Sequence, residues 1–160
     1  MTREHADVRA ALPQRHPLLL VDRVLELTPG ESITTVKAIT ATEPCYAGLP
    51  DGPGVSYAYP VSLLIESFGQ SAALLWLAGG GDARDRDAVL MFAGAREYRV
   101  EGSAHPGDVV RHEVRLDSVI ADTAIASGTS WVGGRRIATV ATLIATRRPV
   151  SGSVPGQASG

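Results

Sequence analysis

The sequence predicts an α+β fold in which a curved antiparallel sheet of about six strands wraps one long central helix. The helix is predicted from residues 61–78, which are apolar on nearly every side and therefore suit the buried axis of a domain. The strands are predicted from short alternating runs that are separated by Gly, Pro and Asp turn signals. Wrapping the sheet around the helix would bury one face of the sheet.

Length and composition favour one soluble globular domain. The chain has 160 residues, is 44% hydrophobic and carries a net charge of −2, which gives no sign of nucleic-acid or membrane-surface binding. We expect a single domain over residues 1–147 and a disordered tail rich in Pro, Gly and Ser over residues 148–160. The single cysteine, Cys45, excludes an internal disulfide. The N-terminus lacks the apolar run of a signal peptide, so we expect a cytoplasmic protein.

The first part of the chain predicts a short helix, a hairpin and a long loop. Residues 6–12 suit a helix that is ended by Pro13. Residues 18–27 and 31–40 are rich in strand formers, and the Pro-Gly pair between them is a turn signal. The loop at residues 42–59 is long for a compact domain, and such loops are often functional.

The central helix has clear start and stop signals. Pro60 suits a helix start, and the glycine run at 79–81 suits an end. The apolar run is nearly long enough to span a bilayer. Because it contains Glu66, Gln70 and several serines and has no basic flank before it, we predict a buried core helix. A polar exit should follow at residues 79–87.

The second half predicts four strands that form an antiparallel meander. Residues 93–95 (Ala-Gly-Ala) suggest a bulge or kink in the first of them. Residues 105–108 (His-Pro-Gly-Asp) have the composition of a turn. The predicted strands cover residues 88–100, 109–116, 123–132 and 135–146.

Glu66 is the only charged residue of the predicted helix, and Gln70 lies one turn later on the same face. An ionised carboxylate in an apolar setting is costly unless it is paired or hydrogen-bonded. Two interpretations follow from the pattern: a catalytic acid or base, or a structural carboxylate at a helix edge that faces water or another subunit.

The opening segment from Leu12 to Val24, LPQRHPLLLVDRV, resembles that of the FabZ-type 3-hydroxyacyl-[acyl-carrier-protein] dehydratases of bacterial fatty-acid synthesis. The resemblance covers roughly residues 11–147. It implies a hot-dog fold and dimers whose two sheets join edge to edge. Four further stretches match in the same order: Glu43-Pro44, Ile65-Glu66 with Gln70, Phe92-Ala93-Gly94 and Pro106-Gly107-Asp108.

The resemblance also implies a lyase reaction, the removal of water from a 3-hydroxyacyl thioester carried by acyl carrier protein. In that family a histidine of a Gly-His-Phe-Pro segment takes the proton next to the thioester carbonyl. A helix carboxylate from the other subunit handles the departing hydroxyl, and a helix-start amide binds the thioester oxygen. Carried over to this chain, Glu66 is the catalytic carboxylate and the amides of Val61 and Ser62 bind the oxygen. Gln70 and Tyr59 are expected to contact the substrate, and we expect no metal and no cofactor.

The family's histidine is missing from the matching position. Reading from Gly48 that position holds Leu49, and reading back from Glu66 it falls near Gly52. No histidine occurs between His16 and His105. We expect surface or packing roles for the remaining histidines, including His112, which should face solvent from an alternating strand.

Three hypotheses remain open. In the first, the chain is half of a dehydratase of fatty-acid or polyketide biosynthesis, and a partner chain that carries the histidine completes its site in a heterodimer; a homodimer with an unrecognised base is a variant of this. In the second, Glu66 serves a hot-dog thioesterase. In the third, the chain is a non-catalytic acyl-binding or scaffold subunit.

Overall fold

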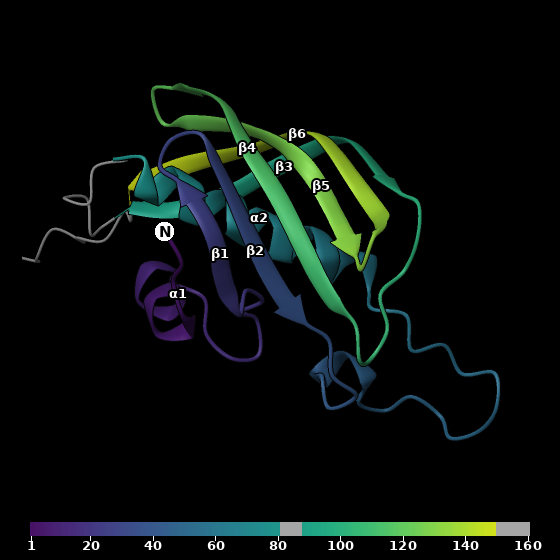
Figure 1. Cartoon of the computed structure of the whole chain (residues 1–160). Coiled ribbons are helices and arrows are strands. Elements are labelled where there is room, and N and C mark those ends of the chain that lie inside the picture. Colours follow the sequence, from purple (N-terminus) through teal and green to yellow (C-terminus); the bar gives the residue numbers. More distant parts are fainter. Residues whose placement is uncertain (81–87, 150–160) are drawn as a thin grey trace, which may run out of the picture.

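The computed structural model describes residues 1–80 and 88–149 and confirms the predicted α+β architecture (Figure 1). Six antiparallel strands form one sheet in the order β1-β2-β4-β5-β6-β3. The sheet curves over the long helix α2, and α1 lies beside β1 (Figure 1). The elements are α1 (His5–Ala11), β1 (Arg23–Thr28), β2 (Ser32–Ala38), the 3-10 turn η1 (Pro44–Tyr46), α2 (Val61–Ala78), β3 (Ala88–Val100), β4 (Val109–Ile120), β5 (Thr123–Val132) and β6 (Arg135–Pro149).

Helix α2 has the predicted limits and forms the centre of the core. It follows Pro60 and ends at Gly79, as its start and stop signals indicate. Phe68 and Leu75 are buried against side chains of the sheet. The helix is long and apolar enough to cross a membrane, but half of that stretch is buried inside the protein, as expected for the core helix of a globular domain.

The predicted first strand is too long at its N-terminal end. β1 begins at Arg23, whereas residues 18–22 lie outside the sheet. Within this segment Asp22 N still donates to Val36 O of β2 at 2.9 Å, whereas Leu20 bonds to the helix instead of to a strand. The Leu20 amide donates to Gln70 Oε1 at 2.8 Å, and the Leu20 carbonyl accepts from Ser67 Oγ at 2.7 Å. The hairpin of β1 and β2 is confirmed.

The predicted four-strand meander is wrong in one respect. β4, β5 and β6 are consecutive neighbours, but β3 lies at the sheet edge beyond β6. Residues 101–108 therefore cross the end of the sheet to reach β4, and they are held there by hydrogen bonds from Tyr59 N to Ala104 O (2.7 Å) and from Ile39 N to Asp108 O (2.9 Å). Strand order depends on such long-range contacts, which the strand patterns do not contain.

The local signals of the second half are confirmed. The pairing of β3 with β6 shifts register between Phe92 and Gly94, at the predicted bulge. The turn at residues 105–108 closes with Asp108 N donating to His105 O (2.9 Å) and His105 N donating to Asp108 Oδ2 (2.8 Å). β6 continues to Pro149, two residues past the predicted domain limit. The rest of the predicted tail and most of the polar exit after α2 lie outside the described residues.

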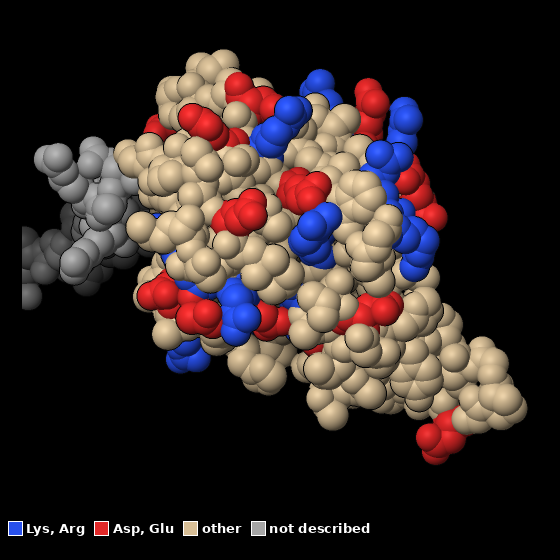
Figure 2. All heavy atoms as spheres, viewed as in Figure 1, with Lys and Arg blue, Asp and Glu red and all other residues tan. Residues whose placement is uncertain are grey.

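The face of the molecule shown in Figure 2 carries acidic and basic side chains that are interspersed rather than separated. Arg111 pairs with Glu113 at 2.9 Å, and Arg136 pairs with Glu101 at 3.0 Å. This face therefore has no broad basic region of the kind that binds nucleic acid, in agreement with the composition.

Gly128 on β5 gives a test of the sheet packing. A Cβ at this position would overlap the backbone carbonyl of Glu113 on β4, so we expect Gly128→Ala to lower the free energy of unfolding by about 1–3 kcal/mol, as overpacking does. At Gly134 an added Cβ meets nothing within 4 Å, and Gly134→Ala should stay within about 0.5 kcal/mol of wild type. Urea unfolding measures both; equal stability of the two variants would contradict the register of β4 and β5.

Candidate functional site

Glu66 lines a narrow, mostly apolar cleft of about 40 Å³ between α2, β3 and the segment that follows α1. Its polar contributions are Glu66, Gln70 and Gln14. A cleft of this size is much smaller than the roughly 300–1,000 Å³ of sites that enclose a small molecule. The remaining lining residues are Leu12, Pro13, Gly69, Ala73, Leu90, Met91, Phe92, Leu143 and Ala145.

The Gln70 side-chain amide fixes the carboxylate of Glu66. Gln70 Nε2 donates to Glu66 Oε1 at 2.9 Å and to Leu18 O at 2.7 Å, while Gln70 Oε1 accepts from Leu20 N at 2.8 Å. Gln70 is only 2% exposed. The structure thus brings Glu66 and Gln70 together as their spacing predicts, and it gives Gln70 the geometry of a residue that orients Glu66. Direct contact of Gln70 with substrate stays a prediction.

The start of α2 presents two free amides. Leu63 N and Leu64 N both donate to Pro60 O at 3.0 Å, but the amides of Val61 and Ser62 have no acceptor among the described residues. Both residues are exposed. Free amides at a helix N-terminus, together with the helix dipole, favour an oxygen that carries negative charge. Glu66 lies five residues after Val61 and four after Ser62, or about 6–8 Å along the helix axis.

Tyr59 lies away from the Glu66 cleft. It is 4% exposed and packs in a second core cluster with Tyr46, Leu64 and Ile137. Neither tyrosine hydroxyl has a hydrogen-bond partner among the described residues. Burial raises the pKa of Tyr59 and raises the pKa of Tyr46 to about 12, so both phenols stay protonated near neutral pH. The expected contact of Tyr59 with substrate stays a prediction.

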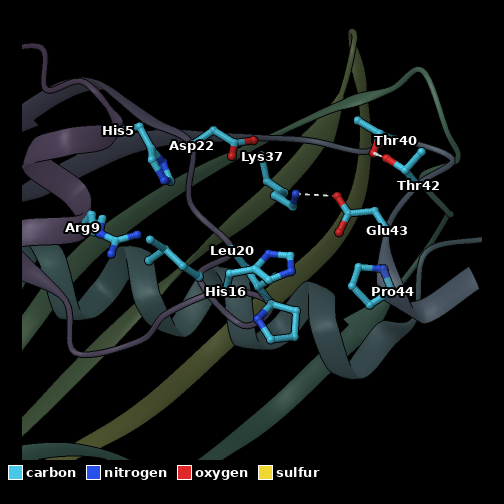
Figure 3. Close-up of a pocket in the computed structure, with 12 residues that line it drawn as sticks. His5, Arg9, His16, Leu20, Asp22, Lys37, Thr40, Thr42, Glu43 and Pro44 are labelled. Carbon is cyan, nitrogen blue, oxygen red and sulfur yellow. Dashed lines mark hydrogen bonds and ion pairs between the residues drawn. The ribbon is translucent and has the colours of Figure 1, made fainter. Parts of the chain in front are cut away.

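None of the four histidines lines the cleft that contains Glu66. His5 and His16 are exposed and border a different pocket of about 290 Å³ (Figure 3). His105 is exposed in the turn before β4. The cleft therefore contains the carboxylate of the expected catalytic pair without an imidazole. Within residues 1–80 and 88–149 there is also no cluster of His, Cys, Asp and Glu side chains suited to a metal ion.

The prediction that His112 faces solvent is wrong. His112 is 0% exposed, with Nδ1 2.8 Å from Ser130 Oγ and Nε2 2.9 Å from Ser67 Oγ. It alternates in phase with Val110 and Val114, which are buried on the same face of β4. The sequence already shows that His112 alternates together with Val110 and Val114. Burial lowers the pKa of His112 to about 3, so the ring is neutral.

The pocket of Figure 3 contains an ion pair that anchors the long loop. Lys37 Nζ on β2 lies 2.6 Å from Glu43 Oε1, and the two side chains are only 9% and 11% exposed. Glu43 immediately precedes η1. The pair therefore ties the start of the loop at residues 42–59 to the sheet. Movement of the loop start away from the sheet would separate the pair and leave a buried charge without its partner, which is costly. The pair therefore holds the loop start against the sheet.

The sequence interpretation missed Gln14 as a site residue. Gln14 Oε1 is buried without a partner among the described residues, and Gln14 lines the cleft with Glu66. A buried acceptor without a partner costs free energy, so it calls for a ligand or water. The only signal in the sequence was its place in the opening segment, which does not show that the segment lies against α2.

Comparison with known proteins identifies the family. Residues 12–141 match the FabA-like domain. The chain is 31% identical over 150 residues to the 3-hydroxyacyl-[acyl-carrier-protein] dehydratase FabZ of Shewanella loihica, covering 91% of this chain and 94% of that protein. The chain belongs to the FabZ-type dehydratase family. The FabZ of Polynucleobacter asymbioticus is 43% identical over 107 residues, which cover 66% of this chain and 67% of that protein.

Solved structures confirm the hot-dog fold. The dehydratase heterocomplex ApeI:P from Xenorhabdus doucetiae matches with a TM-score of 0.70 at 17% identity, covering 88% of this chain and 90% of that one. A hypothetical thioesterase from Streptococcus pneumoniae, solved with coenzyme A, matches with a TM-score of 0.59 at 12% identity, covering 91% and 94%. At such identities the likeness concerns the fold alone.

Burial of His112 predicts how stability depends on pH. The folded-state pKa of about 3 lies below the ordinary value of 6.5, so the unfolded chain binds a proton that the folded chain excludes. The stability contributed by the neutral ring is complete above pH 6.5 and is lost as the pH falls toward 3. For each pH unit by which the pH falls within this range, the exclusion of this proton from His112 should lower the free energy of unfolding by about 1 kcal/mol.

Urea unfolding between pH 7 and pH 4.5 checks this prediction. The free energy of unfolding of His112→Gln should fall less steeply with falling pH than that of wild type, by about 1 kcal/mol per pH unit. Carboxylates and the other histidines contribute to both proteins alike. Parallel curves for the two proteins would mean that His112 is protonated in the folded state.

Proposed function

We propose that this chain is a subunit of a 3-hydroxyacyl-[acyl-carrier-protein] dehydratase in which Glu66 is the catalytic carboxylate. The observation that carries the proposal is the geometry of Glu66, whose carboxylate lies in a mostly apolar cleft on the central helix and is oriented by Gln70 at 2.9 Å. Membership of the FabZ-type family supplies the reaction class.

In the proposed reaction, Glu66 in its acid form donates a proton to the 3-hydroxyl group as the carbon–oxygen bond breaks, and water leaves. A base takes a proton from carbon 2, and the electron pair of that bond forms the carbon–carbon double bond. The free amides of Val61 and Ser62 donate hydrogen bonds to the thioester carbonyl oxygen as negative charge develops on it. Gln14 provides an additional hydrogen-bond acceptor in the same cleft.

The base is proposed to come from a partner chain. None of this chain's histidines borders the cleft, and the cleft is too small to enclose an acyl thioester. One of its walls belongs to β3, an edge strand on which Met91 and Phe92 are 51% and 47% exposed. Pairing of β3 with the same strand of a second subunit would cover these side chains and enlarge the site.

A His-bearing paralogue is the partner that we favour, and a homodimer with a different base remains the variant. The similarity in fold to a dehydratase heterocomplex supports this assignment. The proposed substrate carrier is acyl carrier protein, in fatty-acid or polyketide biosynthesis. We place the reaction in the cytoplasm.

The test is loss of water from a 3-hydroxyacyl-acyl-carrier-protein thioester, followed by mass spectrometry. The protein is assayed alone and after co-purification with its His-bearing paralogue. We expect activity in the mixture and a loss of at least about 100-fold on Glu66→Gln, as for removal of a general acid. Glu26→Gln, an exposed carboxylate on β1, is the matched control and should retain full activity.

The other outcomes separate the alternatives. Activity of the protein alone would favour the homodimer with an unrecognised base. Thioester hydrolysis that depends on Glu66 would identify a thioesterase. An active mixture that is indifferent to Glu66→Gln would exclude the catalytic role of Glu66 and favour a scaffold or acyl-binding subunit.

A further inference from the structure

A buried chain of hydrogen bonds runs from the sheet through α2 to the segment before β1. It begins at Ser130 on β5 and passes through His112 on β4 to Ser67 on α2, with heavy-atom distances of 2.8 and 2.9 Å. Ser67 Oγ then lies 2.7 Å from Leu20 O. Ser67 and His112 are 0% exposed and Ser130 is 2% exposed, so water does not compete for these bonds.

The proton positions in this chain follow from its geometry. Leu20 O can only accept, so the single hydroxyl proton of Ser67 is donated to it. Ser67 Oγ must then accept from the Nε2–H of His112. A neutral imidazole has one N–H group, and Nδ1 therefore accepts from the hydroxyl of Ser130. Each of these protons has one place, and the imidazole is fixed as the Nε2–H tautomer.

The chain continues from Leu20 to Glu66 through Gln70. Leu20 N donates to Gln70 Oε1, so the amide oxygen faces Leu20. The amide nitrogen must then face the other way, where its two protons reach Leu18 O and Glu66 Oε1. If the segment at residues 18–20 moved, the amide would lose the partner that fixes its orientation. An amide turned over would present its oxygen to the carboxylate, which is repulsive.

We propose that His112 is a positioning residue for Glu66: its Nε2–H holds the Ser67 hydroxyl on Leu20, and Leu20 sets the orientation of the Gln70 amide that holds Glu66. A serine in a helix that lacks an outside partner can turn its hydroxyl to the carbonyl one turn back. The hydrogen bond from His112 Nε2–H to Ser67 Oγ opposes this turn, because the rotated hydroxyl would lose it. The catalytic part of this inference rests on the function proposed for Glu66.

The variants distinguish the effect of the N–H donor of His112 from the effect of the volume of its side chain. His112→Leu keeps an apolar side chain at the position but removes the donor, whereas His112→Gln retains an amide N–H that can reach Ser67. Ser67→Ala removes the hydroxyl itself and should reproduce the effect of His112→Leu. Ser71→Ala is the matched control. It removes two equally buried hydrogen bonds from the same helix one turn away, one of 2.7 Å to Thr35 Oγ1 and one of 2.9 Å to the backbone carbonyl of Ser67, and it leaves the side chains of the path to Glu66 in place.

The first readout is NMR of the full chain and needs no catalysis. In His112→Leu and Ser67→Ala we expect hydrogen exchange of the Leu20 amide to accelerate about tenfold or more, since a lost buried hydrogen bond has an effect of that order. The side-chain NH₂ signals of Gln70 should shift in the same variants. His112→Gln and Ser71→Ala should stay within about threefold of the wild-type exchange rate.

The second readout is kinetic and uses the complex with the partner chain. His112→Leu and Ser67→Ala should lower kcat about tenfold or more with KM within about twofold, because a displaced acid affects the transition state more than substrate binding. His112→Gln should restore kcat. Should His112→Leu fail to fold, Ser67→Ala and His112→Gln carry both measurements.

Three results would overturn the inference. Unchanged Leu20 exchange and Gln70 signals in Ser67→Ala would exclude the structural path. Equal changes of Leu20 exchange and Gln70 signals in Ser71→Ala would mean that any loss of a buried hydrogen bond in α2 loosens the core, without a specific path to Glu66. NMR changes without a fall in kcat would remove its catalytic part. If the wild-type complex does not dehydrate the substrate, the proposed function fails, and the NMR result alone decides whether His112 orients Glu66.

Discussion

The arrangement of the site depends on one side-chain amide, that of Gln70. Its oxygen and both of its N–H groups are bonded inside the protein, to Leu20, Leu18 and Glu66. These bonds connect a segment outside the sheet, the central helix and the carboxylate that faces the cleft. They also help to account for the late start of β1, because the backbone groups of Leu18 and Leu20 bond with α2, and only at Asp22 does the backbone bond with β2.

The helix that carries Glu66 is buried through polar contacts as well as apolar ones. Ser67 and Ser71 are fully buried, and each bonds to a group on another element or segment: Ser67 to Leu20 and His112, Ser71 to Thr35. Buried polar groups that are all satisfied hold neighbouring elements in one position. This explains how a helix with serines on several sides can form the centre of a core. It also gives a path by which the orientation of its carboxylate can depend on β4, which contacts the helix through His112 and Ser67.

The proposed site contains only part of the groups that the proposed reaction needs. The cleft contains a carboxylate and a buried acceptor from Gln14, and one wall is an edge strand with exposed Met91 and Phe92. The long loop at residues 42–59, where the resemblance to the family leads us to expect a histidine, is fixed at its start by the buried Lys37–Glu43 pair, but it contains no imidazole. An oriented carboxylate, an exposed apolar edge and a cleft without an imidazole are the features on which our proposal of a second chain rests.

Local residue patterns predict the central helix, the hairpin, the turn at residues 105–108 and a bulge around Gly94, because each depends on neighbouring residues. Pro60 and Gly79 mark the ends of α2, and the spacing of Glu66 and Gln70 places them on one face. The place of β3 at the sheet edge, the burial of His112 and the presence of Gln14 in the cleft of Glu66 follow from tertiary packing. These features depend on contacts between residues far apart in the chain. An alternating strand shows which residues share a face, but the element packed against that face decides whether a histidine on it meets water or Ser67.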